Sequence, residues 1–352
     1  MKISVIRGKF VNQLEINNLP KSTIRRKVII ITSRSAHQVD GFESVRLTSP
    51  SDYFNFFKGY RLLGLNKHIK NADIVYTLTP NLTFTKQAIK TKKREIVKKI
   101  ISFAPNQIPK LNEKSYKDLV NIDHFIVTNK KSELALMKKN VPKEKISLIR
   151  LGIDLKTYRP APPRKYVRKP PLKILTINNN FNKTCTLIDA FEYLCKNKIP
   201  LRLTILSSQK KINKLIRVVN KKRLNTKINI KTVESSRINN EFNNSNIFIN
   251  FLDQGDFGNY YTYPFDLLKA MASKLLVISE KSELTEEILN NTGIIVDNFT
   301  VEAFSSILEK QIVSENNQQK LSQNAYERVR KYYNYQDAQK KIAKIYTTLL
   351  KK

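Results

Sequence analysis

Short apolar runs alternate with amphipathic stretches through the first half of the chain. Apolar residues recur at helical spacing over Tyr53–Leu65, Thr83–Lys93 and Lys131–Asn140. Strands that alternate with helices predict parallel βαβ units with right-handed crossovers. The runs that predict strands are Lys2–Ile6, Lys27–Ser33, Ser44–Leu47, Asp73–Leu78, Lys99–Phe103, His124–Thr128 and Ile146–Leu151.

A proline-rich segment then interrupts this alternation. Residues 160–171 hold five prolines and four cations, a composition typical of a stiff, extended connector. We expect residues 1–159 to form a first lobe and residues 160–171 to form a linker.

The same alternation restarts after the linker. Strands are predicted at Leu172–Ile177, Leu201–Leu206, Ile228–Val233, Ile247–Leu252, Leu275–Ser279 and Gly293–Val296. Helices are predicted at Thr186–Cys195, Lys210–Lys222, Tyr263–Ser273 and Glu283–Asn290, and from Val301 almost to the end. The cluster Tyr332–Tyr335 breaks that last stretch, so residues 172–333 form the second lobe and residues 334–352 a C-terminal helix.

These patterns predict an α/β protein with two Rossmann-like lobes that face a central cleft. The length of 352 residues favours two domains, because single cores stop growing at roughly 250–300 residues. Open parallel sheets bind ligands beyond the carboxyl ends of their strands, so two facing lobes would share one cleft.

The net positive charge of the chain is compatible with several classes of binding partner. Lys and Arg number 64 against 29 acidic residues, a net of +35, which attracts nucleic acid, anionic membrane or phosphorylated small molecules. A general bias toward Lys, Ile and Asn is an equally good explanation of this charge. The cations are spread along the whole chain without a recognition motif, which disfavours nucleic acid.

Other residues exclude several kinds of site. Cys185 and Cys195 stand ten apart on one predicted helix, too far to pair, and reduced thiols are typical of a cytoplasmic protein. Residues 1–6 are typical of a strand rather than a leader, and no apolar run approaches the ~20 residues of a membrane span. His37, His68 and His124 show no metal-ligand spacing, and no Ser-His-Asp or Cys-His set is apparent. We therefore expect a cytoplasmic protein, with any membrane contact peripheral.

The end of the first lobe carries the most specific motif. From Asn140 the chain reads N-V-P-K-E-K-I-S-L-I, and from Leu151 it reads L-G-I-D, followed by Tyr158 and Pro160. This passage resembles the GT-B glycosyltransferases of the fourth sequence family, the group 1 type. The amino terminus, which reads M-K-I-S-V-I-R-G-K-F-V-N-Q-L-E, resembles the archaeal-like branch of that family. The resemblance implies a GT-B fold, retention of anomeric configuration, no metal or cofactor, and a last helix that packs back on the first lobe.

The resemblance also implies an acceptor-side loop after the first strand. Arg7, Gly8 and Lys9 occupy that loop here. A flexible glycine between two cations suits an anionic group of a ligand.

The second lobe carries the implied donor site. In the family, a Gly-Arg after the first strand and a nearby Lys contact the donor pyrophosphate. Here asparagines replace Gly-Arg, and Lys183, with Asn179 beside it, is the candidate for the phosphate contact. A cation at this place neutralises the charge that builds on the leaving diphosphate.

The second donor motif of the family is a pair of glutamates flanking an aromatic step and an E-A-M-A helix. Tyr261 and Lys269 stand at the two glutamate positions, with Tyr263 and Pro264 between them. Lysine cannot accept hydrogen bonds from sugar hydroxyls. Asp256 and Asp266 are nearby candidates to replace the lost carboxylates.

Three functions follow. The first is a metal-independent, retaining glycosyltransferase that moves a hexose from a nucleotide sugar to a lipid, glycan or protein acceptor, with an anionic membrane as a further partner. The replaced glutamates motivate the alternative, a catalytically inactive GT-B scaffold that binds a glycan or a partner. The net charge motivates the third, a nucleic-acid-binding protein. The sequence assigns no catalytic residue.

Overall fold

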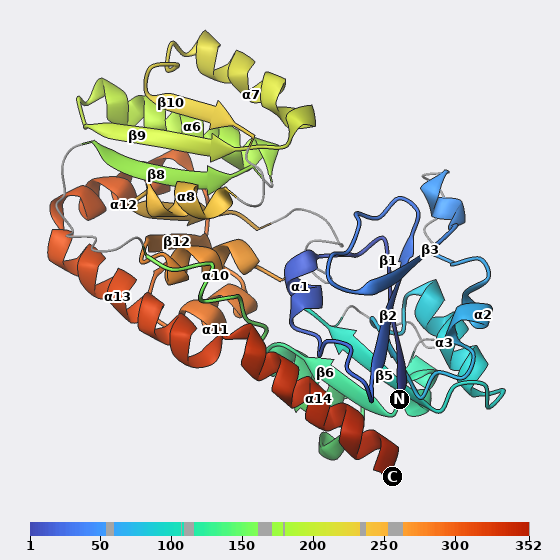
Figure 1. Ribbon diagram of the computed structural model, residues 1–352. Helices are drawn as coiled ribbons and strands as arrows, with labels where there is room; N and C mark the ends of the chain where they lie inside the picture. The colour runs from blue at the N-terminus through green and yellow to red at the C-terminus, as the bar shows by residue number, and fades with distance from the viewer. Residues whose placement is uncertain are drawn as a thin grey trace. The chain divides into compact units, whose positions relative to one another are not determined.

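The computed structural model describes residues 1–53, 60–106, 108, 116–160, 171–178, 180–232, 237–252 and 263–351 (Figure 1). The chain forms two compact units. The first comprises Met1–Leu151 and Tyr335–Lys352 with a short piece that ends at Tyr263, and the second comprises Gly152–Gly258 and Pro264–Asn334. The division after Leu151 precedes the expected linker at 160–171, of which residues 161–170 lie outside the described part.

A seven-stranded parallel sheet forms the centre of the first unit. Its strands lie in the order β3-β2-β1-β4-β5-β6-β7. The inner strands have side chains buried along nearly continuous runs, as expected for parallel strands covered on both faces, whereas the edge strand β3 is mostly exposed. The strands are β1 (Lys2–Gly8), β2 (Lys27–Ser33), β3 (Glu43–Leu47), β4 (Ile74–Thr77), β5 (Lys99–Ala104), β6 (His124–Val127) and β7 (Ile146–Leu148).

The helices of this unit correct one expectation. They are α1 (Gln13–Asn17), α2 (Leu65–Ile69), α3 (Thr83–Lys92), α5 (Lys130–Met137) and α14 (Tyr335–Lys351). The helix expected over Tyr53–Leu65 is wrong in its described part, because α2 begins only at Leu65. Gly64 precedes it with φ +74°, a left-handed conformation that interrupts a helix and that glycine adopts without strain. Residues 54–59 lie outside the described part.

Helix α14 packs on this sheet through one side. Ile342 and Tyr346 are fully buried, and the Tyr346 ring lies 6.3 Å from the ring of Tyr76 in β4. Gln339 Nε2 donates a hydrogen bond of 2.7 Å to the carbonyl oxygen of Asn17, at the end of α1. The C-terminal helix is therefore an integral part of the first unit.

A six-stranded parallel sheet forms the centre of the second unit, in the order β10-β9-β8-β11-β12-β13. Counted from its own first strand, the second sheet has the order 3-2-1-4-5-6 of the Rossmann fold, and the first sheet has the same order with a seventh strand added after the sixth. The expectation of two Rossmann-like α/β units is therefore confirmed. The strands are β8 (Leu172–Ile177), β9 (Leu201–Leu206), β10 (Ile228–Lys231), β11 (Ile247–Asn250), β12 (Leu276–Glu280) and β13 (Ile294–Val296).

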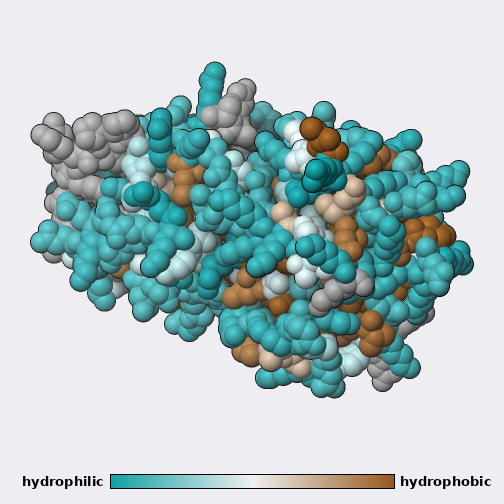
Figure 2. All heavy atoms as spheres, turned by 60° about the horizontal axis from the view of Figure 1, so that its bottom comes forward, coloured by the Kyte–Doolittle hydropathy of each residue, from teal (hydrophilic) through white to brown (hydrophobic). Residues whose placement is uncertain are grey.

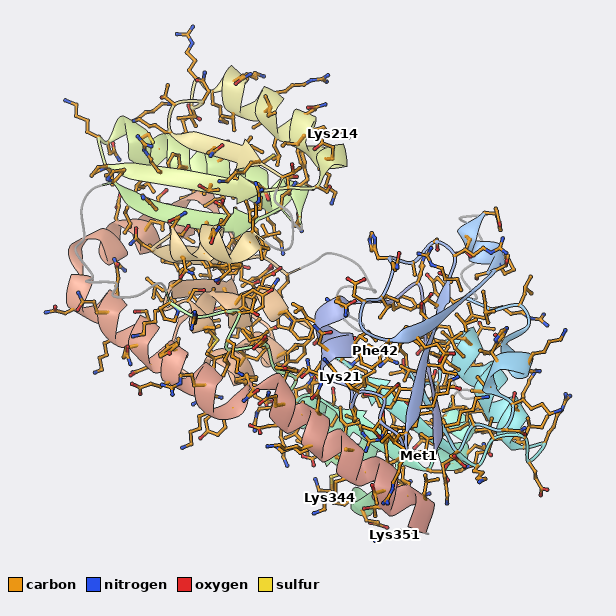
Figure 3. The ribbon with its side chains drawn as sticks, viewed as in Figure 1. Met1, Lys21, Phe42, Lys214, Lys344 and Lys351 are labelled. Carbon is orange, nitrogen blue, oxygen red and sulfur yellow. The ribbon has the colours of Figure 1, made fainter. Side chains whose placement is uncertain are left out.

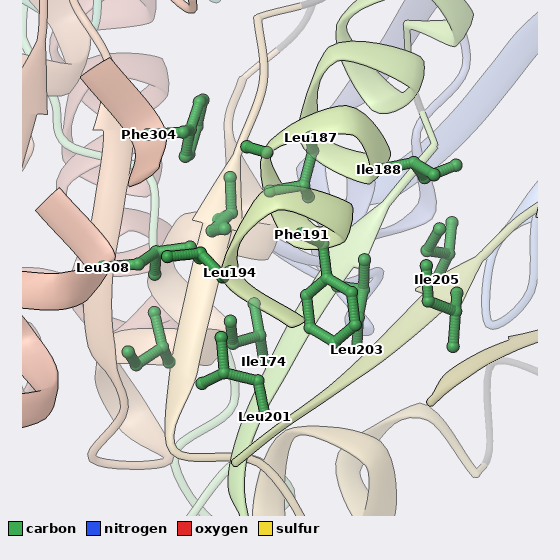
Figure 4. Packing of buried hydrophobic residues seen from close by; sticks show 14 of the residues in the cluster. Ile174, Leu187, Ile188, Phe191, Leu194, Leu201, Leu203, Ile205, Phe304 and Leu308 are labelled. Atoms are coloured by element: carbon green, nitrogen blue, oxygen red, sulfur yellow. The ribbon is translucent and has the colours of Figure 1, made fainter. Parts of the chain in front are cut away.

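Two helices supply much of the core on one face of this sheet. Phe191 and Leu194 of α6 pack among strand residues such as Ile174, and Phe304 and Leu308 of α12 complete the cluster (Figure 4). The helices of the unit are α6 (Phe181–Lys196), α7 (Gln209–Lys221), α8 (Ile238–Asn243), α10 (Phe265–Ala272), α11 (Glu283–Leu289), α12 (Val301–Val313) and α13 (Glu315–Tyr332).

Candidate functional site

Each sheet has one point at which the strand order reverses. It lies between β1 and β4 in the first unit and between β8 and β11 in the second. Helices on either side of such a switch point cover opposite faces, which leaves a crevice beyond the carboxyl ends of the two strands. The residues that follow these strands are therefore the candidates for a ligand site in each unit.

In the second unit, buried amides and hydroxyls follow the strands at the switch point. Asn178, directly after β8, donates from Nδ2 to Ser207 Oγ at 3.1 Å and accepts at Oδ1 from Thr184 Oγ1 at 3.0 Å. Next to them, Asn250 Nδ2 donates to Ser279 Oγ at 2.9 Å and so links β11 to β12. These bonds hold the strand ends in a fixed polar arrangement.

Helix α6 begins at this arrangement. Asn180 is its N-cap, and its Oδ1 accepts from the Lys183 amide at 3.2 Å. The Asn180 side chain is buried, and its Nδ2 has no hydrogen-bond partner among the described residues. A 16-residue helix directs its unpaired first-turn N–H groups and the positive end of its dipole toward the same place. An anion placed there would satisfy both the helix terminus and the Asn180 amide.

Lys183 brings a full positive charge to the first turn of α6. Its Nζ forms an ion pair with Glu280, the last residue of β12, and the two side chains are 20% and 17% exposed. The second carboxylate oxygen of Glu280 accepts from the Leu252 amide at 3.0 Å. The cation is therefore held at the carboxyl edge of the sheet but remains open to solvent and to a ligand.

Lys269 lies on α10 and is held differently. Its Nζ contacts Asp266 Oδ1 at 2.8 Å and lies 5.5 Å from the centre of the Tyr158 ring. Burial lowers the pKa of Lys269, but the Asp266 carboxylate and Tyr158 raise it by more, so the net pKa lies above its ordinary value. Lys269 and Asp266 therefore neutralise each other inside the second unit, which leaves Asp266 engaged rather than free to replace a glutamate.

The remaining predicted donor residues are spread over different parts of the structure. Pro264 immediately precedes α10 in the second unit, whereas Tyr263 is buried and belongs to the first unit. Asn179, Tyr261 and Asp256 lie outside the described residues.

At the switch point of the first unit, Arg7 corrects a prediction. It lies in β1 rather than in a loop, it is fully buried, and its Nε donates to Glu15 Oε1 at 2.7 Å. Its guanidinium lies 4.8 Å from the centre of the Tyr76 ring and 5.5 Å from that of Phe103. Burial raises the pKa of Glu15, against the opposing effect of Arg7. Arg7 is thus enclosed by its own unit, because α1 brings Glu15 onto the end of β1.

The two neighbours of Arg7 differ from it. Gly8 ends β1 with φ +55°, and a Cβ atom there would meet the Phe84 ring at 3.0 Å, so only glycine fits without a shift. Lys9 is exposed, and its Nζ lies 4.6 Å from the centre of the Tyr60 ring. Of the three residues expected to bind an anion in this unit, only Lys9 presents a charge to solvent.

Two further findings concern metals and membranes. Within the described ranges, no group of three or more His, Cys, Asp or Glu side chains has a geometry that could hold a metal ion. No helix in the same ranges is both long and apolar enough to cross a membrane.

On the face shown in Figure 2, hydrophilic side chains predominate and apolar ones form small separate patches.

The family comparison falls on the second unit. Residues 179–328 match the family model of the group 1 glycosyl transferases. The matched range begins at α6 and includes Lys183, Glu280 and α10. Among curated proteins, none is significantly similar to this chain.

Several solved structures share the fold over nearly the whole chain. A glycosyltransferase from Rickettsia africae is 17% identical, with 99% of this chain and 98% of that chain covered and a TM-score of 0.73. Sucrose-phosphate synthase from Thermosynechococcus elongatus is 14% identical, with 99% of each chain covered and a TM-score of 0.71. HepE from Anabaena, in complex with UDP-glucose, is 11% identical, with 99% of this chain and 100% of that chain covered and a TM-score of 0.74. The fold is GT-B, and the family match supports glycosyl transfer in general.

The sequence predicts Lys183 as a candidate but does not predict its partners Asn180 and Glu280. Asn180 carried a usable signal, because an asparagine before an amphipathic helix is a favoured N-cap. Glu280 carried none, since 97 residues separate it from Lys183.

Proposed function

We propose that this protein is a glycosyltransferase that moves a hexose from a nucleotide sugar to a lipid, glycan or protein acceptor. The reaction retains the anomeric configuration and needs no metal or cofactor held by the protein. The single observation that carries the proposal is the N-terminus of α6, whose unpaired hydrogen-bond donors could bind an anion. This terminus lies at the switch point of the sheet and inside the range that matches the family.

The chemistry of donor activation supports this assignment. When the bond between the sugar and the nucleoside diphosphate breaks, negative charge builds on the leaving phosphate oxygen. The first-turn amides of α6, the Asn180 Nδ2 and the Lys183 ammonium are donors that stabilise such charge. HepE is similar in fold and binds UDP-glucose, which makes a uridine nucleotide the first donor to test.

Recognition of the sugar must differ from that in the family pattern. Lys269 replaces a glutamate and is paired with Asp266, so this position supplies no carboxylate to accept hydrogen bonds from donor hydroxyls. We therefore assign the pyrophosphate contact to Lys183. Lys269 instead contacts Tyr158 and so holds α10 in place.

A donor panel tests the proposal. Purified protein is incubated with UDP-, GDP-, ADP- and dTDP-hexoses, and both transfer to added acceptors and slow donor hydrolysis are measured. Lys183→Ala should lower turnover of the accepted donor by about a hundredfold, within the range found when one stabilising donor is removed.

Lys214→Ala provides the matched control, because Lys214 is an exposed lysine on α7 of the same unit (Figure 3). It should leave turnover unchanged. Binding of a donor without any turnover would favour the inactive scaffold instead. Absence of both binding and turnover across the panel would contradict the proposal.

A further inference from the structure

A cavity lies inside the first unit, at the edge of the sheet opposite to the switch point. Its volume is about 660 Å³, within the range of sites that enclose a small molecule. Lys99 and His124, the first residues of β5 and β6, form its end, and α14 forms its wall. The cavity therefore lies at the amino ends of β5 and β6 and along the edge strand β7, away from the switch point of this sheet.

Lysines dominate the charge of this cavity. Lys99, Lys145, Lys341 and Lys344 line it, and within the described ranges none of the four forms an ion pair or a side-chain hydrogen bond. Lys99 and Lys145 are half-buried, and Lys341 and Lys344 are exposed on α14.

Acidic side chains neutralise only part of this charge. Asp123 accepts from Lys92 Nζ at 2.5 Å and from the Ile100 amide at 2.7 Å, so it is already satisfied. Glu144 is the other acidic residue in the lining, and it is exposed. The cavity keeps an excess of positive charge that would be neutralised by an anion.

The rest of the lining is apolar. Leu148 and Ile149 come from β7 and the residue after it, and Ile345 and Leu349 come from α14. On α14 the lining residues stand at positions 341, 344, 345, 348 and 349, the spacing of a single helix face. Along this face, which is about 12 Å long, the two cations stand first and the two apolar side chains follow them toward the end of the helix.

We propose that this cavity binds a single-chain anionic lipid. The alkyl chain packs against Leu148, Ile149, Ile345 and Leu349, and the anionic head group contacts Lys341 and Lys344. The methylene groups of a lysine side chain can cover the apolar surface of a ligand while the ammonium group stays in water. Lys341 and Lys344 can therefore contact both the head group and the start of the alkyl chain. The site is separate from the proposed donor site, so either proposal can fail without the other.

Titration calorimetry tests the proposal, with dodecyl phosphate below its micelle concentration as the probe. Saturable one-to-one binding is expected. Dodecyl maltoside, which has the same chain with a neutral head, and inorganic phosphate, which has no chain, should each bind at least about tenfold more weakly, since head and chain both contribute.

Two double variants on α14 separate a site from diffuse charge attraction. Lys341→Glu/Lys344→Glu should weaken dodecyl phosphate binding by about tenfold or more, because like charges then face the head group. Lys340→Glu/Lys351→Glu changes the net charge equally at two exposed lysines outside the lining, and binding should stay within about twofold of the original protein.

Thr348→Trp fills the cavity without a change of charge. Thr348 is exposed and lines the cavity, so the variant should fold normally and lose binding. The proposal is overturned if this variant binds the probe like the original protein, if both double variants weaken binding equally, or if the probe does not bind. Sedimentation that shows a dimer lost in Thr348→Trp would also overturn it and make the cavity an interface between copies.

Discussion

The two switch points of this protein have the same strand order, but the cation at the first is fully buried in an ion pair, whereas the cation at the second is partly exposed. In the first unit, Arg7 at the end of β1 is fully buried and paired with Glu15 under the rings of Tyr76 and Phe103. In the second unit, Asn180 leaves a buried amide without a partner among the described residues, and Lys183 is 20% exposed. A cation at the carboxyl end of a strand is therefore no evidence of a ligand site until its partners are known.

The difference teaches how one topology supports two roles. The strand order determines where a crevice forms, but the side chains determine whether residues of the same unit occupy that crevice or leave it open to a ligand. At the first position Glu15 neutralises Arg7 with a carboxylate of the same chain, although Arg7 Nη2 has no hydrogen-bond partner among the described residues. The second position keeps donors that an anionic ligand would satisfy.

The largest predicted effect concerns the buried pair. Glu15→Leu should lower the free energy of unfolding of the first unit by about 3–5 kcal/mol, because Arg7 would remain buried without a counter-charge. Chemical denaturation followed by circular dichroism measures it.

Arg7→Met/Glu15→Leu should recover most of this loss, since no unpaired charge then remains. Lys183→Met, in the partly exposed pair of the second unit, should cost less than Glu15→Leu, about 1–2 kcal/mol. If both pairs cost the same, the contrast between the two switch points would be wrong.

The second effect concerns the N-cap of α6. Asn180→Asp keeps a side-chain oxygen for the Lys183 amide but removes the Nδ2 donor and adds a negative charge. Stability should change by less than about 0.5 kcal/mol, whereas UDP affinity should fall by about tenfold.

Asn12→Asp is the matched control for this change. Asn12 is the exposed N-cap of α1 in the first unit, and its Oδ1 accepts from the Leu14 amide at 2.9 Å. UDP affinity, measured by calorimetry, should stay unchanged in this variant. An equal loss in both variants would show a general effect of charge.

A smaller effect is expected at the partner of Lys183. Glu280→Gln keeps an acceptor for the Leu252 amide but removes the counter-charge, so UDP should bind about two- to fivefold more tightly. Glu241→Gln, which breaks the pair with Lys231 in the same unit, should not change UDP binding. Weaker binding in Glu280→Gln would mean that Glu280 positions Lys183 rather than competing for it.

The smallest effect concerns the aromatic surroundings of Arg7. The Tyr346 hydroxyl is buried and has no hydrogen-bond partner among the described residues. Tyr346→Phe should therefore leave the free energy of unfolding within about 0.5 kcal/mol or raise it slightly. Thr77→Val, which breaks the buried 2.9 Å bond to Thr85, should instead cost about 1 kcal/mol.

Most of the fold could be predicted from the sequence. In the part of the chain that the structure describes, all thirteen strands overlap strands expected from runs of Ile, Val and Leu, because buried parallel strands are apolar along their whole length. Helices α1 and α8 were missed, since five or six residues are too few to show a helical period. The helix predicted at Tyr53–Leu65 is wrong in its described part because the apolar spacing continues up to Gly64, whose left-handed backbone interrupts a helix.

The candidate site was less predictable, because its chemistry depends on pairs distant in sequence. Lys183 could be found from the order of motifs, and Asn180 from its capping position. Whether Lys183 and Arg7 are open or enclosed depends on Glu280 and Glu15, which only the packed structure brings to them. The same limit applies to Lys269, whose partner Asp266 lies one helical turn away but whose contact with Tyr158 is tertiary.

Hydrogen exchange with and without UDP, read by mass spectrometry, tests the central claim most directly. UDP should slow exchange at the amides of residues 180–184, at the start of α6, because these N–H groups would bind the diphosphate. Peptides that cover residues 5–17, around Arg7 and Glu15, should exchange at the same rate in both conditions. Protection around Arg7 without protection at α6 would contradict the account.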